Sequence, residues 1–264
     1  MIEVPAKVSI VLPTYNGAKY LRQSIDSCLN QTFKNIELII VDDSSMDETP
    51  DIIQSYQDER IKYVRHKKNR GLSHALNTGF KKATGEYLTW TSDDNYYAEN
   101  AVELMVTILQ INKKIDFVYS NFYIINADNK LLQSVNVLPS KKLKEYNCIG
   151  PCFLYRRKIY EVIGQFNPTA FLAEDYEYWI RVFKRYRMQK LDEFIYWHRL
   201  HSQSLTGQYA EEAKRSADHI RDNFFKIHAM KRRLLSSLSR GKKALRRMLS
   251  AFFVFNRKVI NKMG

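Results

Sequence analysis

The chain has 264 residues, which suits one compact domain with an appendage better than two full domains. Its hydrophobic content of 45% excludes a disordered protein, because disordered chains lack the apolar surface that offsets the entropy of ordering. The net charge of +14 is concentrated in one place, since 12 of the 42 Lys and Arg residues follow Asp222, the last acidic residue. Residues 1–222 carry 30 basic and 28 acidic residues, a net charge of +2. We therefore predict a nearly neutral body that binds no nucleic acid, followed by a basic tail.

The cysteines and the apolar segments indicate where the protein works. Cys28, Cys148 and Cys152 form no paired spacing of the kind that structural zinc requires, so we expect reduced residues in the core. No window reaches the roughly 18 apolar residues of a membrane span. These features favour a cytoplasmic protein.

Over the first ninety residues, short β-branched runs alternate with segments of helical periodicity, which is typical of βαβ units around a largely parallel sheet. We predict strands at 8–12, 36–41, 61–65 and 87–90, the first of them stopped by Pro13. We predict helices at 19–29, from a Thr49 cap onward, and at 72–83 with Gly85 at its end.

After residue 94 the pattern changes to mixed strands. A long helix should turn Val102, Met105, Val106 and Leu109 inward. Strands are predicted at 117–119 and 123–125 with a turn at 128–129, and helices at 159–163, ended by Gly164, and at 175–186.

Polar residues follow three of the predicted strands. They are Pro-Thr-Tyr-Asn at 13–16, Asp-Asp-Ser-Ser at 42–45 and Ser-Asp-Asp at 92–94. Ligands bind beyond the carboxyl ends of parallel strands, yet the chain has neither GxGxxG nor a P-loop to hold phosphates. Adjacent carboxylates such as Asp93 and Asp94 suit a hard divalent cation, although a strand-end Asp-Asp pair is also a common turn and cap signal.

The order of these motifs resembles the inverting family 2 glycosyltransferases of GT-A fold. The resemblance rests on Val8–Asn16 (VSIVLPTYN), Ser24–Phe33 (SIDSCLNQTF), Glu37–Ser45 (ELIIVDDSS), Asn69–Ser73 (NRGLS), Gly85–Tyr87, Ser92–Asp94, Glu174–Tyr176 and Arg199–His201. It spans roughly residues 8–206. It implies an α/β fold of the GT-A type, Rossmann-like, with a mixed, mainly parallel sheet flanked by helices, and here with a helical C-terminal tail.

The resemblance also implies roles for matching residues in binding a nucleotide-sugar donor. The first strand end, Pro13, Thr14, Tyr15 and Asn16, would hold the nucleotide together with Asp43, Arg70 and Asp93. Asp93 and Asp94 match the acidic motif that contacts the ribose and a divalent metal, Mn or Mg. Many relatives carry a further Asp where this chain has Thr91, which leaves the metal site one carboxylate poorer.

Two further motifs concern the reaction itself. Glu174 and Asp175 resemble the general-base motif, with Asp175 as the base and Glu174 orienting it or the acceptor, although an Asp at a helix start is also an ordinary cap. His201 is expected as a third metal ligand, with His198, Arg199 and His74 as weaker candidates; a loop histidine is as often simply solvated. A single displacement predicts inversion at the anomeric carbon.

The tail combines apolar residues at helical spacing with basic residues between them. Leu245, Met248, Leu249, Phe252 and Phe253 alternate with Lys242, Lys243, Arg246 and Arg247. This pattern is typical of a helix on an anionic membrane, although a solvated tail, a helix that packs on the body or on a partner chain, or a segment that binds nucleic acid is also compatible with it.

Together these features predict a hexosyltransferase-type glycosyltransferase, acting at the inner membrane face on a glycan or glycolipid acceptor such as a lipid-linked or surface-polysaccharide precursor. Residues 1–222 would form the catalytic domain, with a nucleotide-binding half (1–94) and an acceptor half (95–206), and 223–264 the membrane tail. UDP is the nucleotide we expect. The alternative is a catalytically inactive module that binds a nucleotide sugar.

Overall fold

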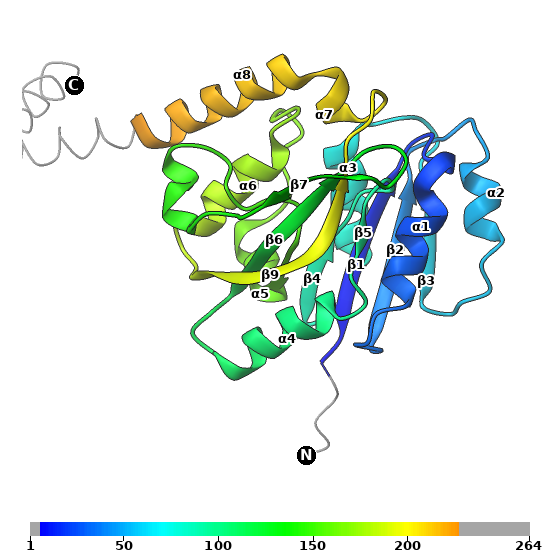
Figure 1. The fold of residues 1–264 in the computed structure, drawn as a ribbon, viewed down its shortest axis with the longest axis horizontal. Coiled ribbons are helices and arrows are strands. Elements are labelled where there is room, and N and C mark those ends of the chain that lie inside the picture. Colours follow the sequence, from blue (N-terminus) through cyan, green and yellow to red (C-terminus); the bar gives the residue numbers. More distant parts are fainter. Residues whose placement is uncertain (1–5, 227–264) are drawn as a thin grey trace, which may run out of the picture. The chain divides into compact units, whose positions relative to one another are not determined.

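A computed structural model describes residues 6–226 of the chain (Figure 1). The strands in this range are β1 (Val8–Thr14), β2 (Ile36–Asp42), β3 (Ile61–Arg65), β4 (Tyr87–Trp90), β5 (Tyr96–Tyr97), β6 (Phe117–Ile125), β7 (Leu131–Val135), β8 (Phe153–Arg156) and β9 (Met188–Arg199). The helices are α1 (Ala18–Leu29), α2 (Thr49–Gln54), α3 (Leu72–Lys82), α4 (Ala101–Ile111), η1 (Ser140–Lys144), α5 (Arg157–Ile163), α6 (Glu174–Phe183), α7 (Leu205–Gln208), α8 (Ala210–Arg221) and η2 (Asp222–Lys226).

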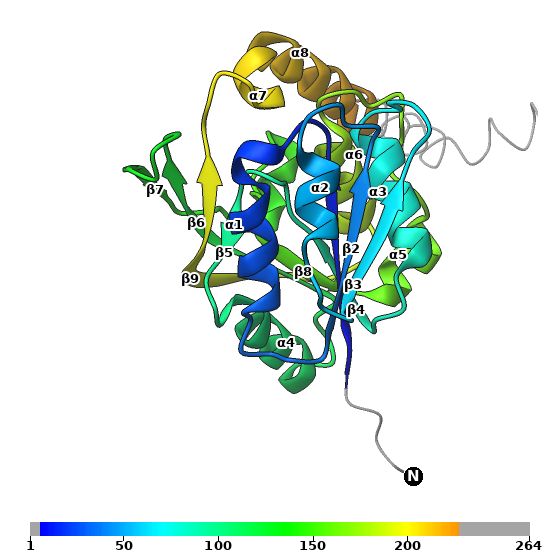
Figure 2. The same ribbon diagram turned by 90° about the vertical axis from the view of Figure 1, so that its right-hand side faces the viewer.

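The described strands form one sheet in the order β3-β2-β1-β4-β8-β6-β9-β5, with β7 paired to β6. The first four strands run parallel, and β1 and β2 are buried along their whole length. Both faces of this half are covered, with α1 on one side and α3 on the other (Figure 2). Such double coverage explains why the first strands are continuous apolar runs rather than alternating ones.

Three details of the first half differ from the sequence prediction. Pro13 does not stop β1, which continues to Thr14 because the carbonyl of Thr14 accepts from the amide of Asp43. Thr49 is the first residue of α2 rather than its cap, and its hydroxyl accepts from the amide of Gly17. Gly85 does not end α3; a Cβ there would lie 2.6 Å from the Lys7 carbonyl oxygen, so glycine permits the close approach of two strands.

The second half is mixed, as predicted, but its strands are longer and more numerous. The two short strands predicted around residue 120 are the single strand β6, which pairs antiparallel with β7 and β8 and parallel with β9. The helix predicted at 175–186 is α6, which ends at Phe183. The four residues predicted to face inward from α4 are buried, and Gly164 ends α5 with a φ of 82°.

These features confirm the predicted fold class, a mixed, mainly parallel α/β sheet flanked by helices. The three cysteines are free and buried, as expected. Between residues 6 and 226, none of the helices has both the length and the apolar character needed to cross a bilayer. The chain divides into two compact units, and the first of them ends at Ile220. The predicted membrane helix lies in residues 227–264, outside the described part of the chain.

Candidate functional site

The carboxyl ends of β1, β2 and β4 meet at one edge of the sheet, where a hydrogen bond from the last residue of β1 holds Asp93. The Thr14 hydroxyl donates to Asp93 Oδ2 at 2.5 Å. Gly17 allows this approach, because a Cβ there would lie 2.1 Å from the same carboxylate oxygen. Burial, followed by the neighbouring charge of Asp94, raises the pKa of Asp93 to about 7. The structure therefore brings together the predicted residues Thr14, Asp93 and Asp94.

Asp94 is paired on one side only. Its Oδ2 lies 3.0 Å from His201 Nε2, whereas its Oδ1 is buried and has no hydrogen-bond partner. Nδ1 of His198 is likewise buried and without a partner, and burial lowers the pKa of that imidazole. A buried polar atom without a partner costs free energy, so its presence calls for an explanation.

A divalent metal ion fits these residues. In the described part of the chain, no three His, Cys, Asp or Glu side chains stand close enough together to enclose a metal by themselves. Mg and Mn do not require such a cage, because they commonly bind one or two carboxylates and take their other ligands from water and substrate phosphates. Asp94 would offer such an ion its one unused oxygen, and His201, whose Nε2 lies beside the other oxygen, is the second residue that would hold it. Thr91 is not available as a further ligand, since it is buried and its hydroxyl is hydrogen-bonded to the Tyr196 hydroxyl.

Arg199 holds this part of the site together, a role that the sequence did not reveal. Its guanidinium is fully buried and donates to the Asp94 carbonyl at 2.9 Å and to oxygens of Gln23 and Asn129 at 2.6 and 2.8 Å. Its backbone amide donates to Asn95 Oδ1. The guanidinium carbon also lies 4.3 Å from the centre of the Tyr20 ring. One side chain thus ties the end of β9 to α1, to the β6–β7 turn and to the loop that carries Asp94.

Asp43 anchors the loop between β3 and α3. Its carboxylate accepts from the amides of Arg70 and Gly71, and its Oδ1 lies 2.6 Å from Nδ1 of His66. Nε2 of His66 in turn lies 2.9 Å from the Thr78 hydroxyl. Asp43 and Arg70 are therefore brought together as predicted, but through the Arg70 backbone. The buried His66 was not among the predicted residues.

Of the other residues predicted to bind the nucleotide, two have a structural role and one is exposed. Pro13 is buried within β1, and Asn16 has a φ of 52° and shapes the turn by bonding Ser45 and Met46. Tyr15 stands 49% exposed beside Asp93 and is available to a ligand.

The predicted base lies at the start of α6. Asp175 accepts from its neighbour's amide, Tyr176 N, at 2.6 Å and from Asn147 Nδ2 at 2.8 Å. Burial raises the pKa of Asp175, and these two donors oppose the rise. Burial, followed by the Asp175 charge, raises the pKa of Glu174 to about 7. Asn147 was missed because it comes from a loop 28 residues earlier, and no local pattern marks the contact.

The structure thus forms three groups: Thr14, Asp93, Asp94 and His201; Asp43 and Arg70; Glu174 and Asp175. Within residues 6–226, no hydrogen bond or ion pair joins Asp175 to the Asp94 group.

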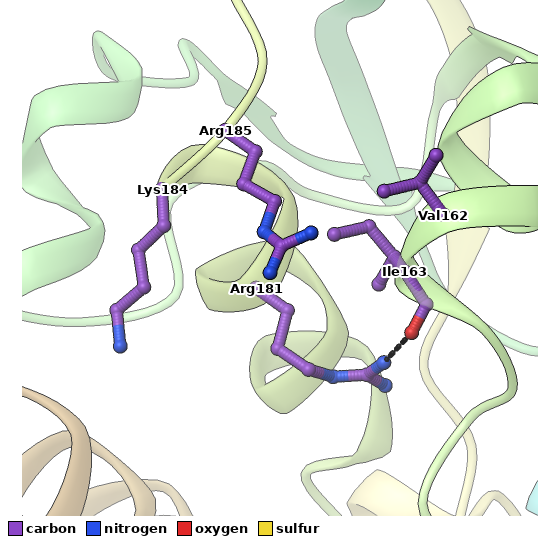
Figure 3. A pocket seen from close by; sticks show the side chains of 5 residues that line it. All are labelled: Val162, Ile163, Arg181, Lys184 and Arg185. Carbon is purple, nitrogen blue, oxygen red and sulfur yellow. Dashed lines mark hydrogen bonds between the residues drawn. The ribbon is translucent and has the colours of Figure 1, made fainter.

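A separate pocket of about 180 Å³ lies between the ends of α5 and α6, lined by Val162, Ile163, Arg181, Lys184 and Arg185 (Figure 3). It contains none of the predicted residues, and it lies at the end of α6 opposite to Asp175.

Comparisons with known proteins agree with this geometry. The family model "Glycosyl transferase family 2" matches residues 9–164. An uncharacterized glycosyltransferase of Rickettsia bellii is 38% identical over 190 residues, covering 67% of this chain and 27% of that protein. UDP-Glc:alpha-D-GlcNAc-diphosphoundecaprenol beta-1,3-glucosyltransferase of Escherichia coli is 30% identical over 225 residues, covering 81% and 85%. The chain spans between about a quarter and three fifths of the rickettsial relatives it matches.

Solved structures share the fold. Staphylococcus aureus TarS 1–349 in complex with UDP-GlcNAc matches with a TM-score of 0.65 at 21% identity, over 75% of this chain and 60% of that one. The mannosyltransferase PcManGT of Pyrobaculum calidifontis, in complex with GDP-Man and Mn²⁺, matches with a TM-score of 0.62 at 19% identity, over 80% and 61%. These matches confirm the predicted GT-A fold.

Proposed function

The chain belongs to glycosyl transferase family 2, as the sequence predicted, and we propose that it is a hexosyltransferase-type enzyme that transfers the sugar of a UDP-sugar to an acceptor hydroxyl with inversion. Residues 1–94 hold the donor and residues 95–206 the acceptor. The acceptor is a lipid-linked glycan precursor, as the name of the Escherichia coli relative suggests. The observation that carries the proposal is the buried Asp94 oxygen without a partner, next to His201, at the carboxyl edge of the sheet.

The donor is held by the ends of the first strands. Tyr15 offers an exposed ring to the base, while Asp43 and the amides of Arg70 and Gly71 shape the loop beside it. Asp94 and His201 are the residues that would hold a divalent cation, and such a cation would supply the positive charge that offsets the negative charge developing on the leaving diphosphate. Arg199 donates to the backbone carbonyl of Asp94 and so holds the loop in place, which keeps the free oxygen of the Asp94 carboxylate pointing in one direction.

Asp175 acts as the general base. The acceptor oxygen forms its bond to the anomeric carbon while Asp175 takes the hydroxyl proton, and the bond to the diphosphate oxygen breaks with its electron pair leaving on UDP. A carboxylate whose pKa is raised by burial is a stronger base than one in water, and the hydrogen bonds from Tyr176 and Asn147 limit that rise in pKa by favouring the ionised form. One displacement on one face inverts the configuration.

The proposal is tested with donors and then with turnover. A thermal-shift screen of UDP, GDP and dTDP, each with and without Mn²⁺, should show the largest rise in Tm for UDP with metal, because a ligand of the native state stabilises it. Asp94→Asn should lose the metal-dependent part of that rise. Asp175→Asn should retain the rise and lose transfer, and proton NMR of the first product should show the inverted anomer. Donor binding without turnover in the unaltered chain would instead favour the inactive binding module.

Membrane attachment through residues 223–264 is part of the proposal and places the enzyme at the inner membrane face. Most of this tail lies outside the described residues. Flotation of the full chain with anionic vesicles should be lost when the Lys and Arg residues between 240 and 258 are replaced by Gln, and flotation that is unchanged would exclude this role.

A further inference from the structure

Exposed apolar side chains gather around the candidate base. Among the described residues, twelve large hydrophobic side chains are exposed, and six of them lie in three segments that adjoin Asp175 or His201. We call these six the apolar rim: Leu138, Tyr146, Phe171, Leu200, Leu205 and Tyr209. Exposed apolar residues scattered singly need no explanation, but a contiguous group beside a polar site is typical of an interaction surface.

Each segment of the rim is tied to a predicted catalytic or metal-binding residue. Tyr146 immediately precedes Asn147, which donates to Asp175. Phe171 lies in the loop that leads directly into Glu174 and Asp175. Leu200 and Leu205 flank His201, whose carbonyl oxygen accepts from the amide and hydroxyl of Ser204. Residues of the rim therefore adjoin both the Glu174–Asp175 pair and His201.

Two of the three segments also contact each other. The rings of Phe171 and Tyr209 pack edge to face with centroids 6.4 Å apart, and the Ser216 hydroxyl donates to the Phe171 carbonyl at 2.8 Å. In Figures 1 and 2, α7, which begins at Leu205, lies at the end of the molecule toward which β1, β2 and β3 run. The segment that contains Leu205, with Phe171 packed against its Tyr209, thus lies at the carboxyl end of the sheet.

The backbone before α6 presents Phe171 outward at an energetic cost. Phe171 is 62% exposed, and the next residue, Leu172, has a φ of 63°. A left-handed conformation is unfavourable for leucine, and such strain tends to persist where function requires it. Burying Phe171 against the body would be the ordinary outcome for a side chain of this size, so its exposure indicates an external partner.

Basic residues accompany the apolar ones in the segment between Leu138 and Tyr146. Between Leu138 and Tyr146, η1 buries Leu143 completely and exposes Lys141 and Lys144. Aromatic and leucine side chains with lysines beside them form the pattern that anchors a protein at an anionic lipid surface. Charge and apolar character therefore point to the same partner, the headgroup region of a bilayer.

We propose that the apolar rim is the surface through which the folded body contacts an anionic bilayer, so that Asp175 faces an acceptor hydroxyl at headgroup level. This inference rests on the lipid-linked acceptor of the proposed function, but it concerns residues of the body and is independent of the C-terminal tail. It predicts that binding to vesicles has a fixed orientation, with the rim toward the lipid.

The test uses the full chain with single introduced cysteines. Tyr146→Cys and Phe171→Cys report on the rim, whereas Ile111→Cys and Val162→Cys are controls, since both residues are exposed and lie elsewhere, at the ends of α4 and α5. The three native cysteines are buried, so a thiol-reactive fluorophore labels the introduced one. Vesicles containing phosphatidylglycerol and brominated lipid chains then quench the probes that reach the bilayer.

We expect quenching at positions 146 and 171 to exceed that at 111 and 162 by at least threefold, and to decrease sharply with purely zwitterionic vesicles. Equal quenching at all four positions, or no quenching at the rim when the chain sediments with vesicles, would overturn the inference, as would failure of the chain to bind vesicles. Paired Tyr146→Ser and Phe171→Ser substitutions should lower vesicle binding while leaving the UDP thermal shift unchanged. A missing UDP shift in the unaltered chain would instead count against the proposed function.

Discussion

Removing the Asn147 amide should move the acidic limb of the pH profile to higher pH. Asn147 Nδ2 donates to Asp175 Oδ2 at 2.8 Å, and this bond favours the ionised carboxylate. A hydrogen bond to a charged group contributes about 1.5–3 kcal/mol, and 1.36 kcal/mol corresponds to one pKa unit. The Asn147 side chain is exposed, so the lower end applies. In Asn147→Ala, the pKa of Asp175 should therefore rise by about one unit.

The assay is kcat against pH at saturating donor and acceptor. A raised pKa leaves the base protonated over a wider range, so the variant should lose activity below the new pKa and regain it above. Tyr176→Phe is a matched control. It removes the hydrogen bond from the Tyr176 hydroxyl to the Leu143 carbonyl, shortly before Asn147 in the chain, and leaves the Asp175 carboxylate untouched. Its pH profile should keep the wild-type shape. Superimposable profiles for Asn147→Ala and the wild type would refute the reasoning.

Three further predictions concern stability and the donor site. Burial raises the pKa of Glu174 to about 7, whereas the usual pKa of this carboxyl in the unfolded chain is 4.5. The native state therefore loses stability as the pH rises between these two values, because the unfolded chain releases the proton first. Glu174→Gln should raise the Tm at pH 8 but not at pH 5, as measured by calorimetry. Gly17→Ala introduces an atom against Asp93, so it should cost about 1–3 kcal/mol in urea unfolding and weaken the UDP thermal shift. Arg199→Lys cannot reproduce the planar set of donors and should cost about 3 kcal/mol, lowering Tm by roughly 6–12 °C; an unchanged Tm would show that those bonds contribute nothing net.

The sequence predicted the nucleotide half of the fold well because its signals are local. Strands buried on both faces are continuous apolar runs, and the helices between them keep helical periodicity, so β4 was placed with its observed bounds. The edge strand β3, which is only partly buried, was also placed with its observed bounds. In β9 the signal is not local. That strand carries Lys190, Asp192 and Glu193, and its long-range pairing with β6 on one side and β5 on the other keeps it extended. Propensity and periodicity could not indicate such a strand.

The candidate site shows the same division between local and long-range information. Asp93, Asp94 and Asp175 could be proposed because each lies in a short motif at a strand end or helix start. The residues that hold them could not, since Arg199 reaches Asp94 across 105 positions and Asn147 reaches Asp175 across 28. These supporting side chains fix the direction of a carboxylate, and a carboxylate can bind a cation or take a proton only if its free oxygen points consistently at one place. Arg199 and Asn147 should therefore influence metal affinity and the pH profile respectively, Arg199 by holding the Asp94 loop and not as the metal ligand that its motif suggested.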